Sequence, residues 1–281
     1  MTLSVVIITY NEETNIARTL ASVQPLVADG RGEIIVVDSG STDRTVEIAK
    51  SYGAKVFVEE WKGYAAQKNS AIEKAAGDWI LSLDADEEVD VELQNSVMTT
   101  ISEWERIDYQ ARNFETGLQI HDGQNRTNYY CNGFFVARKN FFLGRWIKHG
   151  GFWPDRKLRL FRRGLGHVEA RAVHETFAVD GEVADLGKGA LIHHSYPTLA
   201  DYLDHMNRYS SLGAEMVAAR GRVRFSAFNI VARPAATFIY NYFFRLGFLD
   251  GREGVLLHLY HAAYVSWKYA KAWELGREKD S

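Results

Sequence analysis

Four short apolar runs separated by helical stretches occupy the first ~90 residues and restrict the chain to few folds. They are Leu3 to Thr9, Glu33 to Asp38, Lys55 to Val58 and Trp79 to Leu83. The longer runs show little polar alternation, which is typical of strands covered on both faces of a parallel sheet. The β-α-β-α-β-α-β order therefore predicts an α/β fold with a mostly parallel central sheet and right-handed crossovers.

Helix signals lie between these runs. Apolar residues at helical spacing after residue 16 predict a first helix that Pro25 ends. Ser41 or Thr42 is placed to cap a second helix, and a third is expected over residues 65–76.

Polar and acidic residues follow three of the predicted strands, at the sheet edge where such folds bind ligands. These segments are Thr9-Tyr10-Asn11-Glu12, Asp38-Ser39-Gly40-Ser41 and Asp84-Ala85-Asp86. The turn after the first strand contains no glycine, which disfavours a dinucleotide-binding Rossmann domain, and the chain has no P-loop. Two carboxylates one residue apart offer oxygen ligands to a divalent cation that also binds substrate phosphates. The strand ends thus predict a ligand site that includes a cation.

Composition excludes several classes of protein. The 281 residues carry a net charge of -3, which gives no reason to expect nucleic-acid binding. The single cysteine, Cys131, precludes an intramolecular disulfide and fits a reducing compartment. The first residues lack a basic segment and read as a strand, not as a signal peptide. Because no run of ~18 uncharged apolar residues occurs, we expect a cytoplasmic protein without a transmembrane helix.

Three motifs identify a family. V-V-I-I-T-Y-N-E-E, V-V-D-S-G-S-T-D and L-S-L-D-A-D-E, in this order, resemble the family 2 glycosyltransferases of GT-A fold, a likeness that covers about residues 1–175. Further segments are similar to the bacterial lipopolysaccharide-core β-glucosyltransferase branch: W-K-G-Y-A-A-Q-K-N, G-R-W-I-K-H-G-G-F-W-P-D, L-R-L-F-R-R, V-H-E and L-G-F-L-D-G. The resemblance implies inverting, metal-dependent transfer of a hexose, glucose being expected, from a UDP-sugar to a lipid-linked or core-saccharide acceptor.

The resemblance also implies a division of the chain. We expect a GT-A catalytic domain over residues 1–198, with a nucleotide-binding half (1–90) and an acceptor half (91–198). Within the acceptor half, Phe134 to Ala137 reads as a strand and Asp155 to Arg163 as a short helix. A helical, aromatic-rich extension is expected over residues 199–281.

Donor-side roles follow from the resemblance. It implies that the nucleotide pocket is lined by Thr9, Tyr10, Glu12 and Asp38. A carboxylate can accept a hydrogen bond from uracil or ribose, and a tyrosine can stack on a base. The alternative is that Asp38 serves only the turn that follows it.

Lys68 and Asn69 are implied to approach the nucleotide, where a cation could help to hold a diphosphate. The alternative for Lys68 is a solvated lysine on the surface of a helix.

For the cation, the resemblance implies Mg²⁺ or Mn²⁺ bound directly by Asp86, with Asp84 facing the ribose or the metal through water. Such an ion neutralises the charge that grows on the departing diphosphate. His174 is implied either to complete the metal shell or to touch the diphosphate, although a lone histidine is more often structural.

Asp155 is the candidate general base. In the family this residue is the second acid of a Glu-Asp pair that opens a helix before an L-x-x-R pattern, whereas this chain reads Pro154-Asp155. Arg159, in the pattern that follows, is assigned to the donor side. The alternative is that Asp155 caps a helix and pairs with Arg159. Glu175 is the rival base.

On the acceptor side we place Arg145, His149 and Trp153, since aromatic faces stack on sugar rings. His193 and His194 form a metal pair only superficially, because adjacent residues on a strand point to opposite faces.

The C-terminal region is basic and aromatic. Residues 205–281 carry 11 Lys/Arg against 6 Asp/Glu, and residues 225–273 contain 13 aromatics. Helices of this composition often lie in a membrane interface, so we expect a peripheral position on the inner face of the cytoplasmic membrane. The alternative is a helical subdomain packed on the catalytic body.

Two other functions remain open from the residues alone. A nucleotidyltransferase also uses paired acids on a parallel sheet, but it typically has a glycine-rich basic loop after the first strand, which this chain lacks. A catalytically idle sugar-binding or scaffold protein would not need Asp84, Asp86 and Asp155, all of which are present.

Overall fold

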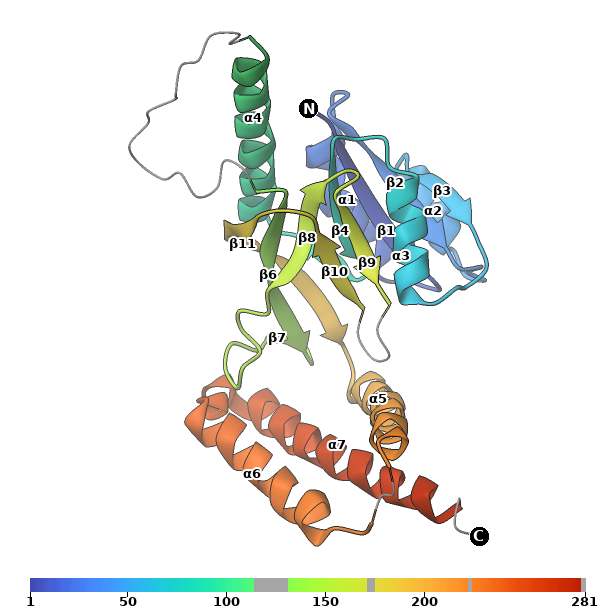
Figure 1. Cartoon of the computed structure of the whole chain (residues 1–281), viewed down its shortest axis with the longest axis vertical. Coiled ribbons are helices and arrows are strands. Elements are labelled where there is room, and N and C mark those ends of the chain that lie inside the picture. The colour runs from blue at the N-terminus through green and yellow to red at the C-terminus, as the bar shows by residue number, and fades with distance from the viewer. Residues whose placement is uncertain (114–130, 171–174, 222–223, 279–281) are drawn as a thin grey trace. The chain divides into compact units, whose positions relative to one another are not determined.

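A computed structural model of the chain describes residues 1–113, 131–170, 175–221 and 224–278 (Figure 1). The chain divides into two compact units: Met1–Arg138 with Arg156–His193, and Lys139–Asp155 with His194–Ser281. We call them the first and second units. The segment 139–155 groups with the C-terminal residues in this division. The domain boundary at residue 198 stays a prediction.

The first unit begins with the predicted alternation of strands and helices. Its parallel strands lie in the order β3-β2-β1-β4. The elements, in chain order, are β1 (Leu3–Thr9), α1 (Ile16–Val27), β2 (Gly32–Asp38), α2 (Thr45–Ser51), β3 (Lys55–Val58), α3 (Tyr64–Glu73) and β4 (Trp79–Asp84). The α/β class and the parallel first half of the sheet are therefore confirmed.

Strands from later in the chain extend this sheet and pair in antiparallel fashion with it where their register is known. They are β5 (Glu87–Val89), β6 (Gly133–Phe142), β8 (Lys157–Arg162) and β11 (Val183–Tyr196); β9 (Gly166–Glu169) and β10 (Thr176–Val179) form a separate antiparallel pair, and α4 (Val91–Asn113) precedes β6. Both β6 and β11 run from the first unit into the second.

The helix expected over residues 155–163 is wrong, because this segment contains strand β8. The side chains of β8 alternate between the two faces of the sheet, so that Leu160 belongs to one hydrophobic cluster and Phe161 to the other. A short strand that is buried on both faces has a sequence pattern similar to that of a short amphipathic helix. The pairing of this segment with β4 and β6 shows that it is a strand.

Hydrophobic clusters cover both faces of the sheet. The first contains Val5 and Ile7 of β1 and side chains of α1, α2 and α4. The second contains Val6 and Ile8 of β1, packed against α3 and β9. This alternation within β1 explains its continuous apolar run, since both of its faces are buried.

Two helix-boundary predictions are also wrong. Pro25 lies inside α1, which continues to Val27, because a proline in the last turn removes only one of the final hydrogen bonds. Helix α2 begins at Thr45 with Arg44 at its cap position, so neither Ser41 nor Thr42 caps it. The Ser41 hydroxyl donates to Asp38 instead.

The second unit is helical after Pro197, as predicted. Its short strand β7 (Arg145–Trp146) pairs with the end of β6. The helical elements are α5 (Leu199–Ala219), η1 (Phe228–Ala232), α6 (Arg233–Ile239), η2 (Tyr240–Phe244), η3 (Gly247–Asp250) and α7 (Gly251–Glu278), and α5 packs along α7. In the described part of the chain, no helix is long and apolar enough to cross a membrane.

Candidate active site

The carboxyl ends of β1, β2 and β4 bring three predicted segments together. Thr9 pairs in register with Asp38, and Ile8 with Asp84. Thr9 is buried, and its hydroxyl has no hydrogen-bond partner among the described residues. Tyr10 is 56% exposed, which leaves its ring available for stacking.

Asp38 is fully buried and is used by the turn that follows it. Its Oδ1 accepts hydrogen bonds from the backbone N–H groups of Gly40, at 2.9 Å, and Ser41, at 2.8 Å, and its Oδ2 accepts from the Ser41 hydroxyl. Asp38 thus stabilises the turn, as the alternative interpretation of the sequence predicted. Nucleotide contact by Asp38 stays a prediction.

Lys68 and Asp84 form the centre of an ionic network. Lys68 Nζ lies 2.9 Å from Asp84 Oδ1 and 2.9 Å from Glu175 Oε1. The Lys68 side chain is only 5% exposed, so the alternative of a solvated lysine on a helix surface is wrong. Contact of Lys68 with the nucleotide stays a prediction. Helix α3 holds this lysine inward because its neighbours Ala71 and Ile72 pack against the sheet.

Arg159 of β8 completes the network from the other side. Its Nη2 lies 2.7 Å from both Asp84 Oδ2 and Glu87 Oε1. Arg138 Nη1 also contacts Glu87 Oε1, at 3.1 Å. The alternative in which Asp155 caps a helix and pairs with Arg159 needed a helix at this position, where the structure has strand β8. Three cations face three carboxylates, and this balance makes the burial of charge tolerable.

Two carboxylates of the network, those of Asp84 and Glu175, have lowered pKa values. Burial alone would raise the pKa of Asp84, but the charges of Arg159 and Lys68 hold it well below its usual range. For Glu175, burial is likewise outweighed by Lys68, which lowers the pKa of this carboxyl. An ionised carboxylate already paired with a lysine is a weaker proton acceptor.

Asp86 faces a different partner. Its Oδ2 lies 3.1 Å from His193 Nε2 of β11, and the pairing with His193 lowers the pKa of Asp86 although burial opposes it. The Thr19 hydroxyl of α1 donates to the carbonyl of Ala85 at 2.7 Å and so holds the loop between the two aspartates. Glu12 is nearby: burial, together with the charges of Asp86, Asp43 and Asp84, raises its pKa.

The ligand atoms at Asp86 suit a cation whose coordination shell is completed by the substrate. Asp86 offers an ionised oxygen and His193 a nitrogen, whereas both oxygens of Asp84 are engaged by Lys68 and Arg159. Among the described residues no group of three metal-binding side chains occurs. His174 lies outside the described residues. Magnesium and manganese commonly take the rest of their ligands from phosphates and water.

Asn69 connects α3 to β9. Its Nδ2 donates to the carbonyl of Val168 at 2.9 Å, and its Oδ1 accepts from the Val168 N–H at 2.8 Å. Both ends of the amide are therefore used in a structural tie beside Lys68. Direct contact of Asn69 with the nucleotide stays a prediction.

The remaining predicted residues belong to the second unit. Asp155 Oδ2 accepts a hydrogen bond from Asn140 Nδ2 at 3.1 Å. His149 Nδ1 lies 2.9 Å from Asp250, which also accepts the backbone N–H groups of Lys148 and His149. The G-R-W-I-K-H-G-G segment and the L-G-F-L-D-G segment, both singled out in the sequence, are thus joined through Asp250.

The other two acceptor-side candidates also have partners in this unit. Arg145 Nη1 lies 3.6 Å from Glu253, and the Trp153 ring meets Trp146 edge-on at 5.2 Å.

Several residues of the site were not assigned from the sequence. They are Glu87, Arg138 and His193. Glu87 directly follows the D-A-D motif, and this position was the sequence feature that could have identified it as a residue of the site. His193 and His194 face opposite ways, as expected: His193 meets Asp86, while His194 stacks on Phe141.

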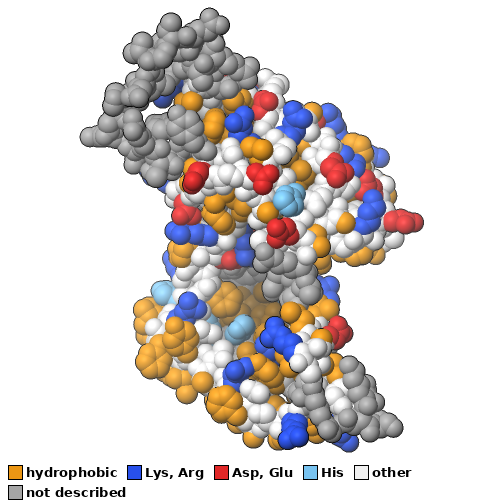
Figure 2. All heavy atoms as spheres, in the orientation of Figure 1, with side chains coloured by type: hydrophobic (Ala, Val, Ile, Leu, Met, Phe, Trp, Pro, Cys, Tyr) orange, Lys and Arg blue, Asp and Glu red, His pale blue; other side chains and the backbone are white. Residues whose placement is uncertain are grey.

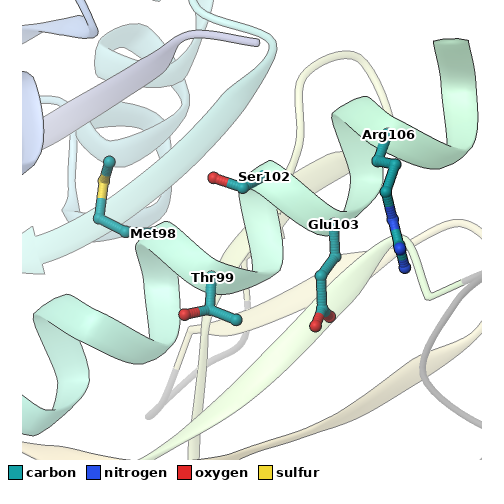
Figure 3. A pocket seen from close by; sticks show the side chains of 5 residues that line it. All are labelled: Met98, Thr99, Ser102, Glu103 and Arg106. Carbon is teal, nitrogen blue, oxygen red and sulfur yellow. The ribbon is translucent and has the colours of Figure 1, made fainter.

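A shallow hollow of about 400 Å³ lies on α4, lined by Met98, Thr99, Ser102, Glu103 and Arg106 (Figure 3). All five side chains come from one helix, and none belongs to the strand-end cluster. The hollow is therefore not part of the candidate site.

The chain belongs to glycosyltransferase family 2, since the model of that family, "Glycosyl transferase family 2", matches residues 4–165. An uncharacterised glycosyltransferase of Rickettsia typhi is 30% identical, over 97% of this chain and 87% of its own. LpsC of Rhizobium meliloti, a lipopolysaccharide core biosynthesis glycosyltransferase, is 27% identical over 95% of this chain and 93% of its own.

Among solved structures, the mannosyltransferase PcManGT of Pyrobaculum calidifontis, in complex with GDP-Man and Mn²⁺, has a TM-score of 0.51. It is 16% identical and covers 97% of this chain and 87% of its own, a likeness that shows the fold. The expected GT-A fold and the expected family are thereby confirmed.

Proposed function

We propose that this glycosyltransferase transfers a hexose, with inversion, from a UDP-sugar to a lipid-linked or lipopolysaccharide-core saccharide at the inner face of the cytoplasmic membrane. The observation that carries the proposal is the Asp84–Asp86 loop of a family 2 enzyme, set between Lys68, Arg159 and His193. The acceptor class rests on the similarity to LpsC along nearly the whole chain.

The donor binds at the carboxyl ends of β1, β2 and β4. Tyr10 stacks on the base, while Glu12 and Asp38 take part in the nucleotide pocket. Lys68 and Arg159 neutralise Asp84 and contribute positive charge beside the diphosphate. The fold does not decide which nucleotide carries the sugar, since an enzyme of the same fold binds GDP-Man. We propose UDP on the basis of the sequence resemblance.

Asp86 and His193 would hold the divalent cation, Mg²⁺ or Mn²⁺. When bound, this ion neutralises the charge that develops on the leaving diphosphate. Asp84 takes an indirect role because Lys68 and Arg159 occupy its two oxygens.

Asp155 acts as the base. Its carboxylate accepts the proton of the acceptor hydroxyl while the hydroxyl oxygen bonds to the anomeric carbon and the bond from that carbon to the diphosphate breaks. Attack from the side opposite the leaving group inverts the configuration. Glu175 is less suited to this step because Lys68 lowers its pKa.

A thermal-shift measurement with nucleotide sugars and Mn²⁺ tests donor and cation together. UDP-glucose with Mn²⁺ should stabilise the wild-type chain by about 2.7 kcal/mol at a hundredfold excess over Kd. Asp86→Ala should lose the Mn²⁺-dependent part of this gain, measured against the variant's own Tm without ligand.

Asp29→Ala is the matched control, since Asp29 is an exposed aspartate in the turn before β2. It should respond to the donor as the wild type does. A full Mn²⁺-dependent response in Asp86→Ala contradicts the cation site. Stabilisation by GDP-sugars alone contradicts the proposed donor.

A further inference from the structure

The segment 225–249 of the second unit turns an apolar side outward. Its exposed large side chains recur at helical spacing along η1, α6 and η2, and several are more than half exposed. They are Phe228 (65%), Val231 (65%), Ile239 (48%), Tyr240 (56%), Phe243 (54%) and Phe244 (75%). We call this set the apolar face.

Small and large neighbours make the face continuous. Ala232, Ala235 and Ala236 are exposed between its larger members. Leu246, Phe248 and Leu249 extend it into η3, each with at least 43% of its surface exposed. Single exposed apolar residues are ordinary on a protein surface, whereas a contiguous patch of this kind marks an interaction site.

The opposite side of the same segment is already packed. Both η1 and α6 contact α7, Pro234 is buried, and the Ser266 hydroxyl of α7 donates to the carbonyl of Ile230 at 2.8 Å. A surface helix normally buries its apolar side and exposes a polar one. Here the outward side is apolar too, so the segment has an unpartnered surface that packing within the unit does not use.

The charge of the segment indicates what covers this surface. Residues 225–249 contain no Asp or Glu and two arginines, Arg233 and Arg245, both exposed. Arg224 precedes them and is exposed as well. Arg245 lies over the Tyr240 ring, at 5.6 Å from its centroid, and Arg233 over Tyr269, at 5.1 Å. Figure 2 shows hydrophobic side chains gathered over α6, at the lower left, with basic side chains beside them.

Aromatic side chains combined with arginines and no acidic residue match the interface of an anionic bilayer, where rings enter the headgroup region and guanidinium groups meet phosphates. Spanning is excluded for the described helices. The consecutive elements η1, α6 and η2 cover residues 228–244, about 25 Å of helix, which is shorter than a hydrocarbon core of ~30 Å.

We propose that the apolar face docks the protein on an anionic lipid bilayer, with η1, α6 and η2 lying in the interface. This docking specifies the membrane position that the proposed function includes. Because the binding needs neither donor nor acceptor, its failure is distinguishable from failure of the transfer reaction.

Vesicle co-sedimentation of the full chain tests the proposal. The wild type should bind vesicles of phosphatidylcholine with phosphatidylglycerol and bind phosphatidylcholine alone at least tenfold more weakly. The double variant Phe243→Ser/Phe244→Ser should lose at least tenfold in its partition to the anionic vesicles. Both side chains are exposed, so the Tm of the variant should equal that of the wild type.

The matched control is Phe57→Ser/Val58→Ser, another adjacent pair of exposed apolar residues, on the edge strand β3 of the first unit. Its vesicle binding should be that of the wild type. A further variant, Arg224→Gln/Arg233→Gln, should reduce the preference for anionic lipid and the sensitivity of binding to salt.

Three results would overturn the proposal. They are a wild type that does not bind anionic vesicles, equal binding by Phe243→Ser/Phe244→Ser, and an effect of the same size in the control pair. If sedimentation velocity shows a dimer that the double serine variant abolishes, without vesicle binding, a second copy of this chain covers the face instead.

Discussion

At the residue scale, the two aspartates of the D-A-D motif have different charged partners. Asp84 is clamped by Lys68 and Arg159, whereas Asp86 is paired with one histidine, His193. A cation can displace a single histidine contact at less cost than two charged contacts in a buried network. This difference in pairing supports the different roles proposed for the two carboxylates.

The identity of the base is tested by two substitutions at this scale. Asp155→Asn should lower transfer by about 10²–10⁴-fold, the usual contribution of a general base, and it should leave UDP binding in calorimetry unchanged. Glu175→Gln should retain most of the activity, because its carboxylate is held by Lys68.

Asp185→Asn serves as the control, since Asp185 pairs with Arg156 in an exposed position. The reverse pattern, with Glu175→Gln inactive and Asp155→Asn active, would make Glu175 the base.

At the scale of elements, β8 is central to the site. It lies between β4 and β6 in the sheet and brings Arg159 to both Asp84 of β4 and Glu87 of β5. The same strand places Leu160 and Phe161 in the two hydrophobic clusters. A strand in this position therefore builds the core and the charge network together.

Arg159→Met should destabilise the chain by about 3–5 kcal/mol, because it leaves Asp84 and Glu87 buried with less compensating charge. Urea denaturation measures this loss. Arg156→Met is the matched control: Arg156 is 58% exposed and pairs with an exposed aspartate, so its loss should cost less than about 1 kcal/mol. Equal effects in the two variants would refute the importance of the network.

At the scale of the whole molecule, stability should depend on the buried histidine of the second unit. His258 is 1% exposed, and its ring nitrogens have no hydrogen-bond partner among the described residues. Burial lowers its pKa to about 4, helped by the charge of His261 and opposed by that of Asp250. The close approach of Gly150 and Gly247 to the ring leaves no room for a larger side chain at either glycine.

The sign of the pH dependence follows from this lowered pKa. Above about pH 6.5 the ring is neutral in both folded and unfolded chains. As the pH falls from 6.5 toward 4, only the unfolded chain gains the proton, so stability falls. Between pH 7.5 and pH 5 the loss from His258 should be about 2 kcal/mol.

Urea denaturation of the wild type and of His258→Leu at both pH values isolates this contribution. The variant should lose about 2 kcal/mol less than the wild type over this interval. Identical losses would assign the acid sensitivity to other groups.

The sequence by itself determined the family, the order of the first strands and helices, and the strand ends where the candidate site lies. Residues within one turn or one strand decide those features, because apolar periodicity and turn residues act locally. The D-A-D loop and the T-Y-N-E turn can therefore be identified from the sequence alone.

Only the tertiary structure decided which charges meet. Lys68 and Glu175 are 107 residues apart in the chain, and Arg159 is 75 residues from Asp84. No local sequence pattern encodes such pairings. The helix prediction for β8 was wrong for the same reason, since it used only the residues of that segment. The packing of residues 225–249 on α7 likewise decides which of their apolar side chains are exposed. The reason is physical: which face of a segment is buried depends on segments remote in the chain, whereas the tendency to form a helix or strand depends on its neighbours.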